Sequence, residues 1–315
     1  MGEAVRICSF LPSATEILFA LGLGDQVVGV THECDYPPAA RERPVVVHST
    51  VDPAVLSSAE IEAAVRASLA GGPGLYVVDA EALRAAAADL IVTQDLCDVC
   101  ALPAEAVTAA IAALPRQPKM VSLKPERLHE VLADIRRVGE AAGRGGEAGR
   151  LVAELTERIT TVGKLTARLN HRPRVLCIEW FDPLYVGGHW IPEMVNLAGG
   201  MDAAGRAGEK SRILAWEEAR AAGPEVIALI PCGFAPERIA RELRSLERLP
   251  GWAALPAVRS GRVYVTDASA YFSRPGPRLV DGLEILAHFL HPEIFAMPDL
   301  PGAGGPLSQA ARTED

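Results

Sequence analysis

The sequence alternates short runs of β-branched and apolar residues with segments of helical periodicity along almost its whole length. In the first half the apolar runs include "VRICSF", "VVGV", "VVVH", "DLIVT" and "KMVSL", and helical patterns separate most of them. Such alternation is typical of parallel sheets wrapped by helices, because a crossover between parallel strands needs a helix-length connection. The sequence therefore predicts an α/β fold that collects ligands at the carboxyl ends of its strands.

A long amphipathic stripe interrupts this alternation near the middle of the chain and predicts one helix over residues 147–169, about 35 Å long. Alternation resumes after it with "RVLCIEW", "EVIALI" and "GRVYVT". We therefore expect two doubly wound α/β lobes, residues 1–146 and 170–298, joined by a rigid helix. Residues 299–315 are rich in Gly, Pro and small polar residues, which predicts a disordered tail.

Charge and composition indicate which classes of partner and which location to expect. A net charge of −9 and no Lys/Arg run predict no nucleic-acid binding. No apolar stretch reaches the roughly 20 residues of a membrane span. The start "MGEAVRICSF" carries no basic region, apolar signal core or lipobox cysteine, so the sequence as it stands predicts a cytoplasmic protein, or a periplasmic or cell-surface one if a signal peptide was removed. No catalytic motif is recognisable, so we expect no enzyme.

Local residues predict where the first helix begins. Ser13 is predicted to cap it, with Glu16 three residues later completing a capping box. Pro12, Ser13 and Thr15 then lie at the helix N-terminus, where backbone N–H groups can meet an acceptor on a ligand. Capping alone would also explain Ser13.

Several stretches together resemble one family. "SFLPSATEILFALGLGDQVVGVTHECDYPP", "LVAELTERI", "WIPEMVNLAGGMD" and "WEEARAAGPEVIAL" follow in the order and spacing of the cobalamin and iron-chelate type of periplasmic binding protein. The resemblance covers Val5 to about Ile294 and is greatest for cobalamin-binding members. It implies two α/β lobes with a corrinoid held in the cleft between them, non-catalytic binding, and no required cofactor.

A corrinoid is a broad, largely apolar plate edged with amides, so its site needs aromatic faces and uncharged polar groups. Most of the candidates follow predicted strands, and Arg212 is a basic residue of the second lobe. In the first lobe they are Pro12, Ser13, Thr15, His32, Tyr36, Gln94, Asp95, Cys97 and Cys100. In the second lobe they are Trp180, Phe181, Trp190, Arg212, Tyr271 and Arg274. The alternative for any single aromatic is core packing, and Trp190 is favoured for the site because it follows the flexible pair Gly187 and Gly188.

Two acids correspond to positions at which transport members of the family meet arginines of an ABC permease. They are Glu81 and Glu217, one in each lobe. The alternative is an ordinary first-turn helix acid, which the helix dipole favours.

The pair Cys97 and Cys100 admits three interpretations. With His32 and Cys34 it would complete a Cys3His zinc set, although "CDVCALP" leads into a helix rather than a zinc knuckle. The pair could instead line the ligand site, or consist of inert thiols.

Two rival functions of the protein stay open. One is an iron-chelate or haem binder of the same fold, which would use Lys210, Arg212 and Arg274. The other is a cytoplasmic metal-handling or redox protein.

Overall fold

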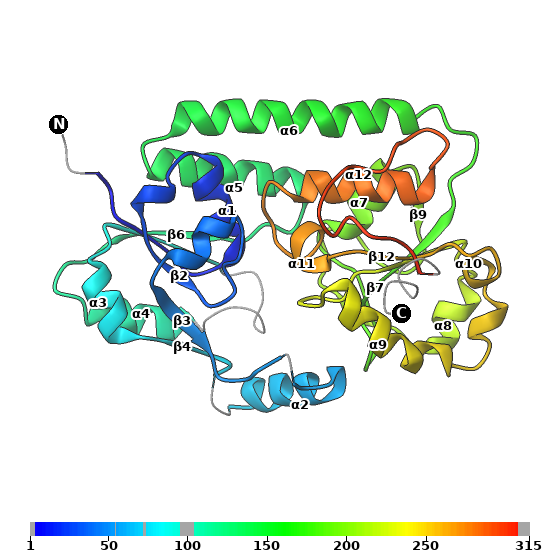
Figure 1. The fold of residues 1–315 in the computed structure, drawn as a ribbon, viewed down its shortest axis with the longest axis horizontal. Helices are drawn as coiled ribbons and strands as arrows, with labels where there is room; N and C mark the ends of the chain where they lie inside the picture. Colours follow the sequence, from blue (N-terminus) through cyan, green and yellow to red (C-terminus); the bar gives the residue numbers. More distant parts are fainter. Residues whose placement is uncertain (1–3, 54, 72–73, 95–103, 308–315) are drawn as a thin grey trace. The chain divides into compact units, whose positions relative to one another are not determined.

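The computed structural model describes residues 4–53, 55–71, 74–94 and 104–307. The chain divides into two compact units. Unit 1 comprises Met1–Pro125 and His129–Glu154, and unit 2 comprises Glu126–Leu128 and Leu155–Asp315. Each unit contains its own sheet with helices packed on it, so the predicted α/β class is confirmed (Figure 1).

Unit 1 is built on a six-stranded sheet with the order β4-β3-β2-β1-β5-β6. Its strands are β1 (Ile7–Ser9), β2 (Val27–Thr31), β3 (Val45–Ser49), β4 (Tyr76–Val78), β5 (Leu90–Gln94) and β6 (Lys119–Leu123). All neighbours run parallel except β3 and β4. The central strands β1 and β5 are buried along nearly their whole length, as expected for strands covered on both faces.

Helices and 3-10 turns connect these strands. They are α1 (Pro12–Ala20), η1 (Gly24–Gln26), η2 (Pro38–Glu42), α2 (Ser58–Leu69), α3 (Ala80–Ala86), α4 (Ala104–Ala112) and α5 (Leu128–Ala141). Helix α2 begins with a capping box, in which the Ser57 side chain accepts from the Glu60 N–H and the Glu60 carboxylate accepts from the Ser57 N–H.

The start of α1 differs from the prediction. The cap position is Leu11, no side chain caps the helix, and Pro12 is its first residue. Proline suits this position because its missing N–H would be unpaired there in any case. Ser13 therefore lies inside the first turn, and the predicted Ser13–Glu16 capping box is wrong.

Helix α6 (Gly145–Thr166) is a single continuous helix that passes from unit 1 into unit 2 (Figure 1). Its buried residues include Ala148, Val152, Leu155 and Val162, which repeat at helical spacing. No helix among the described residues combines the length and the apolar character that crossing a bilayer requires.

Unit 2 has a seven-stranded sheet with the order β10-β8-β7-β11-β12-β13, and β9 pairs with the start of β7. The strands are β7 (Arg174–Trp180), β8 (Tyr185–Val186), β9 (Met201–Asp202), β10 (Arg212–Ile213), β11 (Val226–Leu229), β12 (Val263–Val265) and β13 (Gly305–Pro306). The helical segments are α7 (Ile191–Leu197), α8 (Trp216–Ala221), α9 (Pro236–Glu247), η3 (Trp252–Ala254), α10 (Pro256–Arg259), α11 (Ala268–Tyr271) and α12 (Leu279–Leu290). The core strands β7, β11 and β12 run parallel.

The predicted disordered tail is wrong for residues 299–307. Strand β13 pairs antiparallel with β12, Ala303 is buried, and the Gly302 carbonyl accepts from the Asp267 N–H at 2.9 Å. Gly302 and Gly304 have φ of +73° and +81°. The glycines that suggested disorder instead permit the turn that brings this segment back to the sheet edge.

Candidate ligand-binding site

The carboxyl edge of the unit 1 sheet carries several of the predicted site residues. Strand β1 has β2 on one side and β5 on the other, so the order of connection reverses between β1 and β5. Open α/β sheets bind ligands at such a switch point, outside the carboxyl ends of the strands. Here β1 leads through Phe10 and Leu11 into Pro12, and β5 ends at Gln94. The predicted site residues Asp95, Cys97 and Cys100 follow Gln94 and lie outside the described residues.

A small pocket of about 20 Å³ lies at this edge. Its lining residues come from β2, β3, β4 and the segments that follow β1 and β2: Phe10, Leu11, Pro12, Thr31, His32, Glu33, Val47 and Tyr76. The His32 side chain is 27 % exposed, and its ring centroid lies 6.0 Å from that of Tyr76. His32 Nδ1 lies 3.3 Å from the Val47 carbonyl oxygen. Because a carbonyl only accepts, Nδ1 is the donor in this contact, and Nε2 on the other side of the ring lies 4.0 Å from Glu33 Oε1.

Two other predicted residues of this edge face the interior. Thr15 is fully buried and donates to Ser9 Oγ at 2.8 Å. Cys34 is buried, with its Sγ 3.0 Å from Thr15 Oγ1 and 3.3 Å from Thr31 Oγ1. Thr15 thus stabilises the turn after β1 in this structure and has no surface to offer a ligand.

Metal binding at this edge gains no support from the described residues. Among them, no three His, Cys, Asp or Glu side chains form a group that could hold a metal ion. Cys34 directs its sulfur to threonine hydroxyls, and the other two cysteines of the Cys3His set lie outside the described part of the chain.

Ser13 and Tyr36 complete the predicted residues of unit 1. Ser13 is buried, and its Oγ has no hydrogen-bond partner among the described residues. Tyr36 is 45 % exposed and lies between β2 and η2. Tyr36 therefore presents a large aromatic face to solvent beside the carboxyl end of β2.

The carboxyl edge of the unit 2 sheet carries an aromatic cluster. Trp180 ends β7, and its ring centroid lies 5.0 Å from that of Phe234, which follows β11. Phe181 is buried and lies 6.2 Å from Phe234, and the Arg238 guanidinium stands 3.6 Å above the Phe234 ring. Sequence reasoning missed Phe234, although it follows the apolar run "EVIALI" closely and the strand-end criterion would have found it.

Two aromatic residues predicted for the site pack inside unit 2. Trp190 is 4 % exposed, and its Nε1 donates to the Phe272 carbonyl at 2.8 Å. Tyr271 is 3 % exposed, and its hydroxyl donates to the Pro301 carbonyl at 2.6 Å. Both side chains bury their rings and pair their polar atoms internally, which is the core-packing alternative.

The glycines before Trp190 serve close packing rather than flexibility. A Cβ on Gly188 would lie 2.4 Å from the Ser211 nitrogen and 2.5 Å from the Glu209 oxygen. Only glycine lets the two backbone segments approach this closely. The reason for favouring Trp190 as a site residue was therefore wrong.

The predicted basic residues differ in their surroundings. Arg212 pairs with Glu218 and donates to the Ala204 carbonyl at 3.1 Å, and the bond from Arg212 lowers the pKa of Glu218. Arg274 is partly buried in the loop after α11. The charge of Arg212 is thus already offset by a carboxylate.

The two predicted docking acids lie in comparable positions. Glu81 is exposed in the first turn of α3, and Glu217 is exposed in the first turn of α8. Both positions suit an acid because of the helix dipole, and both leave the carboxylate accessible to a partner.

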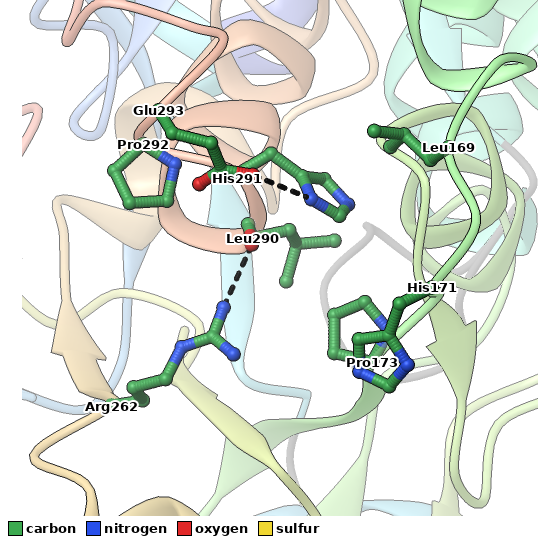
Figure 2. Close-up of a pocket in the computed structure, with 8 residues that line it drawn as sticks. All are labelled: Leu169, His171, Pro173, Arg262, Leu290, His291, Pro292 and Glu293. Atoms are coloured by element: carbon green, nitrogen blue, oxygen red, sulfur yellow. Dashed lines mark hydrogen bonds and ion pairs between the residues drawn. The ribbon is translucent and has the colours of Figure 1, made fainter.

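A larger pocket, of about 290 Å³, lies at the amino end of the unit 2 strands (Figure 2). Arg262, just before β12, donates to the Leu290 carbonyl at 2.7 Å. This carbonyl belongs to the last residue of α12, where the helix itself provides no donor. His291 is buried, with Nε2 3.1 Å from the Gly199 carbonyl oxygen. The pocket lies at the edge of the sheet opposite to the aromatic cluster, so its size alone does not make it the ligand site.

Comparison with known proteins decides the family. Residues 7–270 match the periplasmic binding protein family. The chain belongs to this family. The resemblance predicted from the sequence is thus confirmed, together with the two-lobed α/β fold.

This periplasmic binding protein is similar to three proteins of known name or structure. It is 26 % identical over 298 residues to the ABC transporter substrate-binding lipoprotein YvrC of Bacillus subtilis (strain 168), covering 93 % of this chain and 82 % of YvrC. It is 50 % identical over 50 residues to the vitamin B12-binding protein of Vibrio cholerae serotype O1, covering 16 % of this chain and 18 % of that protein. The periplasmic heme-binding protein RhuT from Roseiflexus sp. RS-1, in apo form, is 25 % identical with a TM-score of 0.70, covering 92 % of this chain and 98 % of RhuT.

Proposed function

We propose that this protein is the substrate-binding component of an ABC importer and that its ligand is a cobalamin-like corrinoid. The observation that carries the ligand class is the 50 % identity over 50 residues with a vitamin B12-binding protein. The transport role is supported by the match to YvrC over 93 % of this chain. Binding of this kind is non-catalytic and needs no cofactor besides the ligand.

The chemistry of both sheet edges supports an amide-edged, largely apolar ligand. Unit 1 offers the Tyr36 ring and the half-buried imidazole of His32. Unit 2 offers Trp180 against Phe234. Arg212, a cation that a carboxylate-bearing ligand would use, is paired with Glu218. Aromatic faces and uncharged polar groups suit a plate edged with neutral amides.

The competing ligand is haem or another iron chelate. It is favoured by the 25 % identity with the heme-binding protein RhuT over 92 % of this chain. A haem binder needs cations for the ligand carboxylates, and Arg274 at the carboxyl side of unit 2 is a candidate, whereas Arg238, like Arg212, already pairs with a carboxylate, that of Glu242 at 3.0 Å. The remaining alternative, a metal-handling or redox protein, predicts metal in the protein as purified.

Delivery to a membrane permease follows from the transport role. We infer export to the cell surface or periplasm, since the relatives include a lipoprotein and a protein described as periplasmic, whereas the cytoplasmic location expected from the sequence gains no support from them. Glu81 and Glu217 would then contact permease arginines. Charge reversal of both should abolish ligand uptake by cells that depend on the protein and leave ligand affinity unchanged. Glu247→Arg, at an exposed acid near the end of α9, is the control.

Calorimetric titration with cyanocobalamin, cobinamide and haemin tests the ligand. We expect both corrinoids to bind and haemin to bind more weakly. His32→Ala should weaken corrinoid binding, whereas His171→Ala, an exposed histidine at the opposite edge of its sheet, should not. Tight binding of haemin with no binding of either corrinoid, in a folded sample, would replace the corrinoid by the rival ligand.

A further inference from the structure

His189 occupies an unusual backbone position in the turn between β8 and α7. Its φ is +50°, in the left-handed region that residues other than glycine rarely adopt. The turn is held by two backbone hydrogen bonds, from the His189 N–H to the Glu209 carbonyl at 2.6 Å and from the Gly208 N–H to the His189 carbonyl at 2.9 Å. Such conformations persist where the surrounding structure enforces them, and they concentrate at ligand-binding sites.

The imidazole of His189 is half-buried and lies against Trp190, with centroids 5.6 Å apart and planes inclined by 30°. Its Nδ1 is buried and has no hydrogen-bond partner among the described residues. Nε2 also has no partner there, but it is not enclosed and so reaches solvent. Burial lowers the pKa of His189, Lys210 lowers it further, and Glu126 opposes them, so the ring is neutral at neutral pH.

A neutral imidazole carries one proton, and the surroundings decide which nitrogen holds it. A proton on Nδ1 would bury an N–H donor that has no acceptor, which costs the full desolvation of that donor. A proton on Nε2 can be hydrogen-bonded by water or by a ligand. The structure therefore favours the Nε2–H form, in which the ring offers one uncharged donor at the surface.

We propose that His189 contacts the ligand and donates its Nε2–H to an uncharged carbonyl oxygen at the edge of the ligand, such as a primary amide of a corrinoid. The identity of the ligand rests on the proposed function. A neutral donor matches an amide carbonyl, whereas a carboxylate gains most from a cationic donor. His189 would thus favour an amide-edged chelate over a carboxylate-edged one.

Nitrogen-15 NMR of histidine-labelled protein tests the tautomer directly. We expect the His189 signals to show a proton on Nε2 in the free protein and to shift when cyanocobalamin is added. A proton on Nδ1, or signals unaffected by a corrinoid that binds, would overturn the proposal.

Three variants separate the donor from the backbone. His189→Ala should weaken cyanocobalamin binding by about 3- to 10-fold. His189→Asn tolerates the left-handed conformation and donates through its amide, so it should retain most of the affinity. His189→Gly relieves the backbone and removes the donor, so it should raise the unfolding temperature while losing the same affinity as His189→Ala.

Failure of the proposal and failure of the proposed function differ. If wild-type protein binds cyanocobalamin and His189→Ala binds it equally well, the His189 contact is wrong and the function stands. If wild-type protein binds haemin and neither corrinoid, the function and the amide assignment are both overturned.

Discussion

Arg158 on helix α6 and Glu284 on helix α12 form a two-point ion pair within unit 2. The Arg158 Nε donates to Glu284 Oε1 at 2.9 Å, and its Nη2 donates to Oε2 at 2.7 Å. The same Nη2 reaches Asp281 at 2.6 Å. These contacts raise the pKa of Arg158, and they fix the second half of the long helix to the closing helix of unit 2.

Replacing Arg158 by methionine should lower the free energy of unfolding of unit 2 by about 1–2 kcal/mol. The substitution leaves two partly buried carboxylates beside each other without a cation. Denaturant unfolding followed by tryptophan fluorescence measures the change. Arg150→Met is the control. The Arg150 side chain is 71 % exposed, and its Nη2 lies 3.9 Å from Glu147 Oε1, which makes a weak surface ion pair. This substitution should change the free energy of unfolding by less than about 0.5 kcal/mol.

Asp202 makes stability depend on pH. Burial raises its pKa, although the Ala204 and Gly205 N–H groups oppose this. A carboxyl whose pKa is higher in the folded state binds its proton more tightly there. The contribution of Asp202 to the free energy of unfolding is therefore most favourable below its pKa in the unfolded state. This contribution is lost as the pH rises through its pKa in the folded state.

Asp202→Asn should consequently stabilise the protein at pH 7, and the gain should disappear as the pH falls below about 4, where the wild-type carboxyl is protonated in both states. The asparagine oxygen can still accept from the two N–H groups. Thermal unfolding at several pH values measures the difference. Asp299→Asn, at an exposed acid, is the control and should change stability at pH 7 by less than about 0.5 kcal/mol.

Trp180 and Trp190, two of the four tryptophans of unit 2, should respond differently to substitution. Trp190→Phe leaves the Phe272 carbonyl without its donor and should destabilise unit 2 by about 1–3 kcal/mol. Trp180→Ala removes a partly exposed ring at the carboxyl edge and should mainly weaken ligand binding. A large loss of affinity in Trp190→Phe with full stability would contradict the core placement of Trp190.

Gly188→Ala should destabilise unit 2 by several kcal/mol, about 3 or more, because the new Cβ meets backbone atoms that cannot move independently. Gly149→Ala provides the matched control. Gly149 lies within α6, and a Cβ there meets nothing within 4 Å. This control should stabilise the helix by about 0.5–1 kcal/mol, measured by chemical denaturation.

Thiol labelling should separate the cysteines. Burial raises the pKa of Cys8 to about 12, and Cys34 and Cys177 are also buried, so all three should react slowly in the folded protein. Labelling of Cys97 and Cys100 should be fast without a corrinoid and slow with it. If labelling rates of Cys97 and Cys100 are unchanged by a corrinoid that binds, the pair does not line the site.

The sequence by itself determined the α/β class and the long helix, because these depend on periodicity and on local signals, and it indicated the family through its resemblance in several motifs. The run from Gly145 to Thr166 keeps one apolar stripe, and the Ser57 capping box involves residues three apart. Interactions of this range are contained in the local sequence.

Only the tertiary structure decided which side chains of the candidate site face outward. Trp190 and Trp180 lie in one stretch of aromatic residues, yet Trp190 finds the Phe272 carbonyl 82 residues away and turns inward. The Tyr271 hydroxyl donates to the Pro301 carbonyl, and the Asp267 N–H donates to the neighbouring Gly302 carbonyl. These hydrogen bonds hold a segment for which composition predicted disorder. His189 is a further case, because its left-handed backbone is held by hydrogen bonds with Glu209 and Gly208. Partners so distant in sequence are chosen by packing, since a buried polar atom pairs with whichever group the fold brings within hydrogen-bond distance.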